Sequence, residues 1–280
     1  PVWPLHTWLP DAHTDAPTAG SVMLAGVLLK MGGYGMIRVS ATMFPGVMTD
    51  IGWLIIVAGV VNVLYGAAVT VRQTDLKRLI AFSSISHMGF VLIGLSSVVG
   101  IGGTVSSTGL TGAAFQMFTH GTITGLMFLV VGYIYEKTGT RYIPDLGGLA
   151  SKMPILATSF LVAGLASLGI PGTSGFVSEI LIFLGTFGVW SWLTAIGVFG
   201  IVLTAGYILW MIQRSLFGPV IPRFENVKDA SAIEVIPIAI LVFLIISIGI
   251  YPSIITDVFT SGVDPIIESF NTDSFTRLNQ

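Results

Sequence analysis

Apolar stretches with almost no charge alternate with short polar segments along the chain. The apolar stretches cover residues 18–38, 51–71, 79–97, 111–135, 155–188, 191–217 and 233–251. Each is about 20 residues or longer, which lets a helix cross a hydrocarbon core of roughly 30 Å. The pattern therefore predicts an all-α fold, a polytopic transmembrane helix bundle with seven crossings.

Two parts of this pattern are not typical of continuous helices. Prolines are too dense in residues 1–17 for one regular helix, so we expect a broken or re-entrant element before the first span. The stretch 155–188 is interrupted by a cluster of helix breakers, Gly169, Pro171, Gly172 and Gly175. We interpret it as a discontinuous transmembrane helix. Its break should adjoin protein or water, because lipid cannot satisfy the freed backbone groups.

The composition agrees with a membrane protein. Only 9% of the residues are charged and the mean hydropathy is +0.89, whereas soluble domains are about one-quarter charged. The net charge of −2 gives no reason to expect a nucleic-acid partner. There is no cysteine, which excludes disulfides and iron–sulfur ligation. The four histidines form no recognisable ligand pair, so we expect no metal and no cofactor on this chain.

The basic residues predict the orientation in the membrane. Seven crossings place nine of the 12 Lys and Arg on one side: Arg72, Lys77, Arg78, Lys137, Arg141, Lys152, Arg214, Arg223 and Lys228. The opposite side receives only Arg38 and Arg277. Basic loops face the cytoplasm, which places the loops 72–78, 136–153 and 214–232 there, together with residues 1–17. The C-terminal tail then faces outward. The chain opens without Met, so we expect it to be the later part of a longer polypeptide.

Four ionisable side chains lie inside the apolar spans: Lys30, His87, His120 and Glu179. Each sits on a different span; Lys30, for example, is about 12 Å along a helix from Arg38. A charge at that depth costs at least about 2.5–3.5 kcal/mol, so such residues indicate a function. Buried lysines and carboxylic acids titrate closer to neutral pH than exposed ones, and histidine already titrates near it. The sequence thus predicts a proton path through these four residues.

Structural roles are the alternative for each of them. A histidine can simply link two helices, Lys30 can extend towards the interface, and Glu179 can satisfy the helix end beside the break. Four such groups at one depth favour the proton path. Hydroxyl groups beside the histidines would hold water along it: Ser83, Ser84, Ser86 and Thr119.

A weaker candidate lies near the start of the chain. Asp11, His13 and Asp15 have the side chains of a metal site, but prolines separate them. We favour a helix-entry loop for this segment and expect no metal there.

Short motifs in a fixed order resemble the antiporter-like subunits of respiratory complex I. They run from residue 1 to about 218 and are Pro4–His13 (PLHTWLPDAH), Ala16–Gly20 (APTAG), Leu24–Lys30 (LAGVLLK), Asp75–Ile80 (DLKRLI), Ser83–Phe90 (SSISHMGF), Gln116–His120 (QMFTH), Leu168–Gly172 (LGIPG) and Gly175–Glu179 (GFVSE). Ser178 stands where many related antiporter subunits have a lysine. This difference favours the branch of the family that lacks that lysine.

The resemblance implies a fold of two inverted five-helix repeats, each with a broken helix. Residues 1–218 would be the second repeat with its following helix, and residues 219–280 a cytoplasmic loop, a last transmembrane helix and an outward-facing tail. By the same resemblance, Lys30 is the central lysine and Glu179 the exit station. The family's further lysine and first-repeat glutamate lie outside this sequence.

The implied function is a proton-translocating membrane subunit of an NADH:quinone oxidoreductase in a bacterial plasma (inner) membrane. NADH, FMN, iron–sulfur clusters and quinone would be bound by partner subunits, both membrane and peripheral. One alternative is a subunit of a multisubunit Na⁺/H⁺ antiporter or of a membrane-bound hydrogenase. An alternative of another class is a non-conducting membrane anchor.

Overall fold

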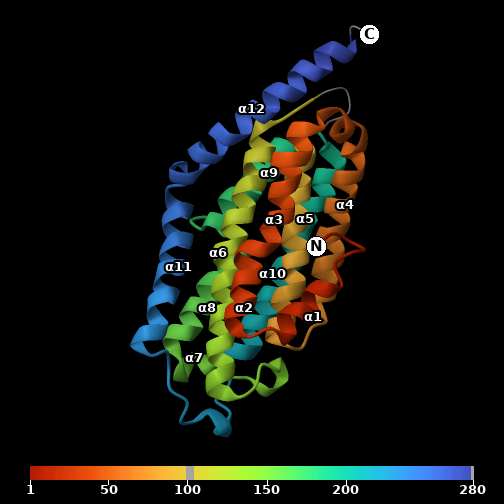
Figure 1. Cartoon of the computed structure of the whole chain (residues 1–280). Helices are drawn as coiled ribbons and strands as arrows, with labels where there is room; N and C mark the ends of the chain where they lie inside the picture. Colours follow the sequence, from red (N-terminus) through yellow and green to blue (C-terminus); the bar gives the residue numbers. More distant parts are fainter. Residues whose placement is uncertain (99–103, 279–280) are drawn as a thin grey trace.

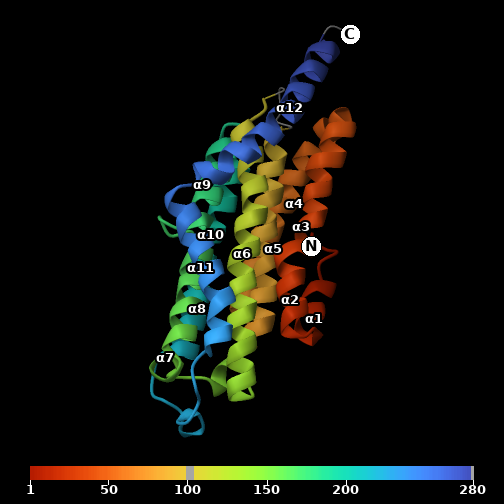
Figure 2. The ribbon, with the colours of Figure 1, turned by 60° about the vertical axis from the view of Figure 1, so that its left-hand side comes forward.

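The structure is a bundle of helices that run roughly along one long axis, with a last helix crossing one end (Figure 1, Figure 2). It is a computed structural model that describes residues 1–98 and 104–278, with side chains described as far as residue 270. No strand occurs within these ranges. The predicted all-α class is confirmed.

The helices of the structure coincide with the predicted spans, with small changes of boundary. Within the described residues, six helical segments are long and apolar enough to cross a membrane. Four are single helices: α4 (Pro45–Val71), α6 (Ser107–Thr138), α10 (Ser191–Leu216) and α11 (Ala232–Ile250). The other two are Thr18–Ala41, which contains α2 (Thr18–Met23) and α3 (Leu29–Gly35), and Leu76–Val98, which contains α5 (Leu76–Leu95). The predicted seventh crossing coincides with two shorter apolar helices, α8 (Pro154–Ser167) and α9 (Ser174–Phe187). The chain is a multi-pass membrane protein.

The break between α8 and α9 is non-helical, as its glycines and proline predict. Gly169 and Gly172 have φ angles of 69° and 93°, in the region that only glycine enters without strain. A Cβ atom at Gly249 of α11 would collide with the Gly172 carbonyl oxygen, so α11 packs directly on the break. A Cβ atom at Gly169 would collide with a carboxylate oxygen of Glu179. The break therefore adjoins both protein backbone and a polar side chain.

Helix ends are set by local capping groups. The carboxylate of Asp75 accepts a hydrogen bond from the Arg78 backbone N–H at the start of α5, 3.0 Å away. Ser231 and Glu234 form a reciprocal capping box at the start of α11. Gly139 ends α6 in a left-handed conformation, with φ 72°.

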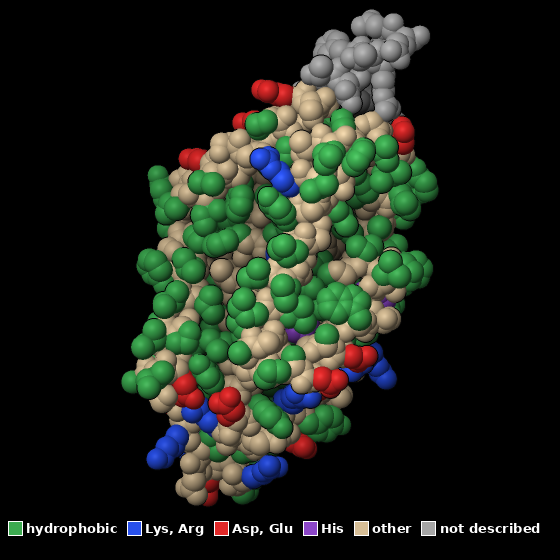
Figure 3. All heavy atoms as spheres, viewed as in Figure 1, with side chains coloured by type: hydrophobic (Ala, Val, Ile, Leu, Met, Phe, Trp, Pro, Cys, Tyr) green, Lys and Arg blue, Asp and Glu red, His purple; other side chains and the backbone are tan. Residues whose placement is uncertain are grey.

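Charged side chains gather at the end of the bundle that carries the loops 136–153 and 214–232, whereas apolar side chains cover its middle (Figure 3). Several of the basic groups are paired there. Arg141 contacts Asp75 at 2.6 Å and Lys137 contacts Glu234 at 3.0 Å. The distribution agrees with the asymmetry used for the topology, and the side of the membrane on which this end lies remains a prediction.

The start of the chain lies deeper than the sequence predicted. The Asn62 side chain, midway along α4, accepts a hydrogen bond from the Trp3 N–H at 2.7 Å and donates one to the Pro1 carbonyl at 2.8 Å. Figures 1 and 2 accordingly show the N-terminus at mid-height of the bundle. Placing all of residues 1–17 at the basic end was wrong. The segment descends from mid-depth and forms α1 (Trp8–Asp15) beside α5.

The segment after residue 252 is a helix rather than an irregular tail. This helix, α12 (Ser253–Leu278), crosses the end of the bundle opposite the basic loops (Figure 2). Its buried side chains, Val263, Ile266 and Phe270, recur every three or four residues and pack on a cluster that includes Ile37 and Leu110. The sequence prediction treated this segment as a polar tail and did not use the helical spacing of its apolar residues.

Candidate functional site

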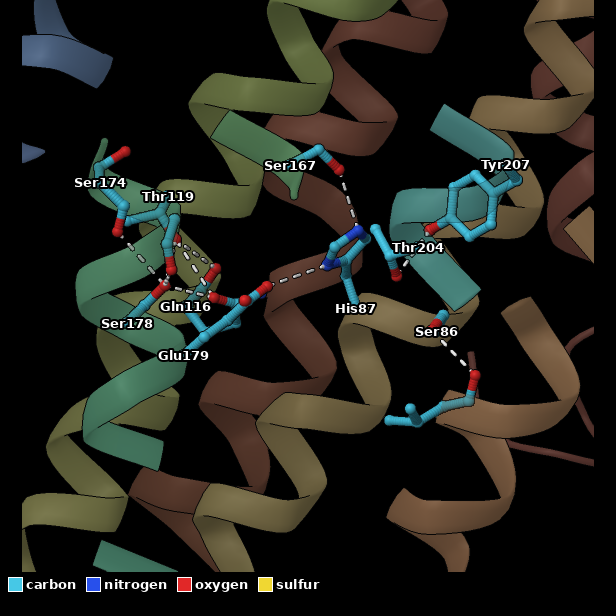
Figure 4. A network of polar contacts seen from close by, with 12 residues as sticks. Ser86, His87, Gln116, Thr119, Ser167, Ser174, Ser178, Glu179, Thr204 and Tyr207 are labelled. Atoms are coloured by element: carbon cyan, nitrogen blue, oxygen red, sulfur yellow. Dashed lines mark hydrogen bonds and ion pairs between the residues drawn. The ribbon is translucent and has the colours of Figure 1, made fainter. Parts of the chain in front are cut away.

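The four predicted ionisable residues meet in the interior of the bundle, although they come from four separate crossings. Lys30 lies on α3, His87 on α5, His120 on α6 and Glu179 on α9. All four are buried, with at most 9% of each residue exposed. Figure 4 shows the part of this site around His87 and Glu179.

Lys30 and His120 form the first pair. The Lys30 Nζ atom is 2.7 Å from His120 Nδ1 and also donates a hydrogen bond to the Ala25 carbonyl, five residues earlier. That carbonyl belongs to a π-helical turn, Leu24–Leu28, and such turns recur at functional sites. The two spans meet at Gly26 and Gly121, where a Cβ on Gly121 would lie 2.7 Å from the Gly26 carbonyl oxygen. Two glycines thus bring the helices close enough for the pair to form.

His87 and Glu179 form the second pair. The Glu179 Oε1 atom is 3.8 Å from His87 Nδ1, and the other ring nitrogen, Nε2, is 3.0 Å from the Ser167 hydroxyl. The helix break brings these groups together, because Ser167 is the last residue of α8 and Glu179 lies in the second turn of α9. Both ring nitrogens of His87 therefore face groups that flank the break (Figure 4).

The two pairs are adjacent. The rings of His87 and His120 lie 5.5 Å apart, measured between their centroids. Side chains around them enclose a cavity of about 10 Å³. Its lining is His87, Gln116, Thr119, His120, Ile123, Ala166, Ser167, Gly175 and Glu179. A polar cavity of this size accommodates about one water molecule. His120 Nε2 is buried and has no hydrogen-bond partner among the described residues, so it is a group that such a water would satisfy.

A cluster of neutral polar side chains adjoins Glu179 on α9 and α6. The Ser178 hydroxyl donates to the side-chain oxygen of Gln116 and lies 3.0 Å from the Thr119 hydroxyl. Sequence reasoning did not select Gln116, Ser167 or Ser178 for the site. Gln116 lies about one helical turn from His120 and Ser178 is next to Glu179, so proximity to the ionisable residues was the signal that would have found two of them.

The predicted water-holding residues differ in their surroundings. The hydroxyls of Ser83 and Ser84 donate to the Ile80 carbonyl of their own helix, and Ser86 donates to Val63 of α4 at 2.9 Å. Thr119 lines the cavity between the histidines and Glu179. A role in holding water stays a prediction for all four.

The residues of the weaker candidate point to different partners. Asp11 contacts Arg78 at 3.0 Å, whereas the His13 ring stacks on Phe128 with centroids 4.4 Å apart. Within the described part of the chain, no group of three or more His, Cys, Asp or Glu residues is placed to hold a metal ion.

Comparison with known proteins gives the class. The family model described as NADH:quinone oxidoreductase/Mrp antiporter, TM, matches residues 1–204. The chain belongs to this family of membrane subunits, and the resemblance inferred from the motifs is confirmed.

Particular relatives agree with this assignment. The chain is 42% identical over 274 residues to NADH-quinone oxidoreductase subunit M of Rhodobacter capsulatus, a match that covers 98% of this chain and 52% of that protein. It is also 42% identical over 269 residues to F(420)H(2) dehydrogenase subunit M of Methanosarcina mazei, covering 95% of this chain and 52% of that protein. The chain thus spans about half the length of these relatives.

A solved structure shows the same arrangement of helices. In respiratory complex I from Thermus thermophilus with bound NADH, a chain with 32% sequence identity superposes with a TM-score of 0.85. The match covers 96% of this chain and 55% of that chain. The predicted antiporter-like fold is confirmed, while the division of the chain at residue 218 stays a prediction.

Proposed function

We propose that this chain is part of a proton-translocating membrane subunit of an NADH:quinone oxidoreductase. The observation that carries the proposal is the buried series Lys30, His120, His87 and Glu179, in which each member lies beside the next although they come from four spans. Ionisable groups are costly at this depth. A series of them therefore indicates selection for moving charge rather than for stability.

Distances within the series suit stepwise proton transfer. Lys30 and His120 are in direct hydrogen-bond contact at 2.7 Å. His87, His120 and Glu179 all line the cavity between them, so one water there would bridge the remaining steps. Each member has a form that accepts a proton and a form that donates one.

Electrostatic repulsion gives the series a way to move charge. Two unit charges 5.5 Å apart, the separation of the histidine rings, repel by about 3 kcal/mol at an effective dielectric constant of about 20. Moving one charge against 100 mV costs about 2.3 kcal/mol. Protonation of one histidine therefore disfavours protonation of the other by enough to push a proton on towards Glu179.

Redox chemistry would reside on other chains. We expect NADH, FMN, iron–sulfur clusters and quinone on the membrane and peripheral partner subunits, since this chain has no cysteine for cluster ligation. The F(420)H(2) dehydrogenase subunit matches the chain as well as the NADH-quinone oxidoreductase subunit does. We infer that the identity of the electron donor is set by those partners.

Two alternative functions, a different kind of proton-moving complex and a non-conducting membrane anchor, are less well supported by the site. A subunit of a multisubunit Na⁺/H⁺ antiporter or of a membrane-bound hydrogenase would use the same series under a different driving reaction. A non-conducting anchor would leave the buried series without a purpose. The chains that copurify with the full-length protein distinguish all three.

We further propose that the complex lies in a bacterial plasma membrane with the loops 72–78, 136–153 and 214–232 in the cytoplasm and α12 on the outer face. The asymmetry of Lys and Arg supports this orientation.

Substitution of the two ends of the series tests the function. In the intact complex in proteoliposomes, Lys30→Ala and Glu179→Gln should each abolish most proton pumping and, through coupling, slow quinone reduction. Lys228→Ala and Glu225→Gln are matched controls, because both residues are exposed in the loop after α10. Wild-type pumping by correctly assembled Lys30→Ala and Glu179→Gln complexes would overturn the proposal.

A further inference from the structure

A second cavity, with hydroxyl groups in its lining, lies at the outer end of the bundle, away from the four ionisable residues. It has a volume of about 340 Å³ and lies between α6, α9 and the start of α12. Its lining residues are Ser107, Thr108, Thr111, Val177, Leu181, Pro252, Thr256 and Thr260. Five of these eight carry a hydroxyl, from α6 on one wall and α12 on the other. Hydroxyls gathered in this way at a membrane-protein cavity favour water over lipid.

One face of α6 connects this outer cavity to the buried site. Thr111, Phe115 and Thr119 are spaced by four residues, so they lie above one another on successive turns. Thr111 lines the outer cavity and Thr119 lines the inner one. Phe115 lies between them and is fully buried. The two cavities are therefore separated, along this face, by the one helical turn that carries Phe115.

The aromatic turn is completed by α12. The ring of Phe259 lies 6.0 Å from that of Phe115, and the next residue, Thr260, lines the outer cavity. Apolar constrictions of this kind block water and ions by excluding water. Further along α12, Val263, Ile266 and Phe270 anchor the helix to the bundle.

We propose that the outer cavity is the outward vestibule of the proton path and that Phe115, held by Phe259 of α12, is its barrier. The inference rests on the proposed function and adds the segment beyond Glu179. The species that passes is a proton carried on water, relayed from Glu179 past Ser178 and Thr119 when the aromatic pair separates. In this arrangement α12 is a positioning element, because it holds the barrier closed without taking up a proton itself.

Cysteine accessibility tests the vestibule, since the chain has no native cysteine. Thr111→Cys and Thr256→Cys are introduced singly into the intact complex in vesicles and treated with a membrane-impermeant methanethiosulfonate from each side. Both should react from the outer side only, and the modification should stop most pumping. Thr119→Cys should be protected from the same reagent and become reactive when Phe115→Ala is added.

Thr49→Cys is the matched control. Thr49 is exposed near the outer end of α4, and its hydroxyl donates to the carbonyl four residues earlier, as that of Thr256 does. It should react without loss of pumping. No reaction at Thr111→Cys and Thr256→Cys, reaction from the loop side, or modification without effect on pumping would each overturn the vestibule.

Proton leakage tests the barrier separately from the vestibule. Phe115→Ala should make the vesicles leak protons, so that the proton gradient falls while quinone reduction continues at an undiminished rate. Phe115→Leu should restore the block. Phe160→Ala should not leak, because Phe160 is equally buried but is not among the residues that line either cavity. Tight vesicles with Phe115→Ala would overturn the barrier. The Glu179→Gln complex distinguishes the proposed proton path from the proposed vestibule. If Glu179→Gln stops pumping while modification of Thr111→Cys and Thr256→Cys leaves pumping unchanged, only the vestibule is wrong.

Discussion

Gly169 offers a sharp test of how the helix break positions Glu179. Its φ angle of 69° is left-handed, so Gly169→Ala costs about 1–2 kcal/mol in backbone strain. The new Cβ would also collide with a carboxylate oxygen of Glu179, which would have to retreat by about 1 Å to reach ordinary van der Waals contact. A displacement of this size at a reacting group lowers a rate by up to about 100-fold.

A substitution at Gly172 separates the backbone strain from the collision with Glu179. Its φ angle of 93° makes Gly172→Ala comparably strained, but no atom of the described residues lies within 4 Å of the position that the new Cβ would take. Both substitutions should lower the thermal stability of the complex by a similar amount. Only Gly169→Ala should slow proton pumping in proteoliposomes. Equal losses of pumping in the two variants would refute the idea that the break acts through the position of Glu179.

Three further predictions follow from single features of the structure. Asn62→Ala should cost about 1–3 kcal/mol in stability, because the Trp3 N–H and the Pro1 carbonyl lose their partner at mid-depth; an unchanged thermal melt would contradict this. His87→Gln should slow pumping less than Lys30→Ala, because water in the adjoining cavity can take over part of the relay, and equal losses of initial pumping rate would contradict this. Ser151→Cys and Ser261→Cys, both at exposed positions, should react with an impermeant thiol reagent from opposite sides of oriented vesicles; labelling from the same side would contradict the topology.

Much of the fold could be predicted from the sequence because a membrane restricts the choices. Only helices satisfy the backbone of an apolar segment in lipid, so hydropathy places the spans. The break at Gly169–Gly175 was predictable because glycine and proline, which interrupt helices, cluster there. Lys30 and Glu179 were identifiable because ionisable residues in apolar spans are rare.

Other parts depend on tertiary contacts that sequence patterns do not specify. Lys30 and His120 are 90 residues apart in the chain, and their contact depends on the close approach of Gly26 and Gly121. Ser167 resembles many other hydroxyl residues of transmembrane helices, so nothing in the sequence distinguished it. The depth of Pro1 is set by Asn62, whose role becomes visible only once α4 is packed beside the first residues.

The central claim is that protons pass through the series that ends at Glu179, and infrared difference spectroscopy of the working complex tests it directly. A carboxylic acid that gains or loses a proton changes its carbonyl stretching band. We predict such a band during NADH-driven turnover, its absence in Glu179→Gln, and its persistence in Glu225→Gln. We also predict that it is lost in Lys30→Ala, because no proton would reach Glu179. A turnover spectrum that is identical in the wild type and in Glu179→Gln would contradict the account.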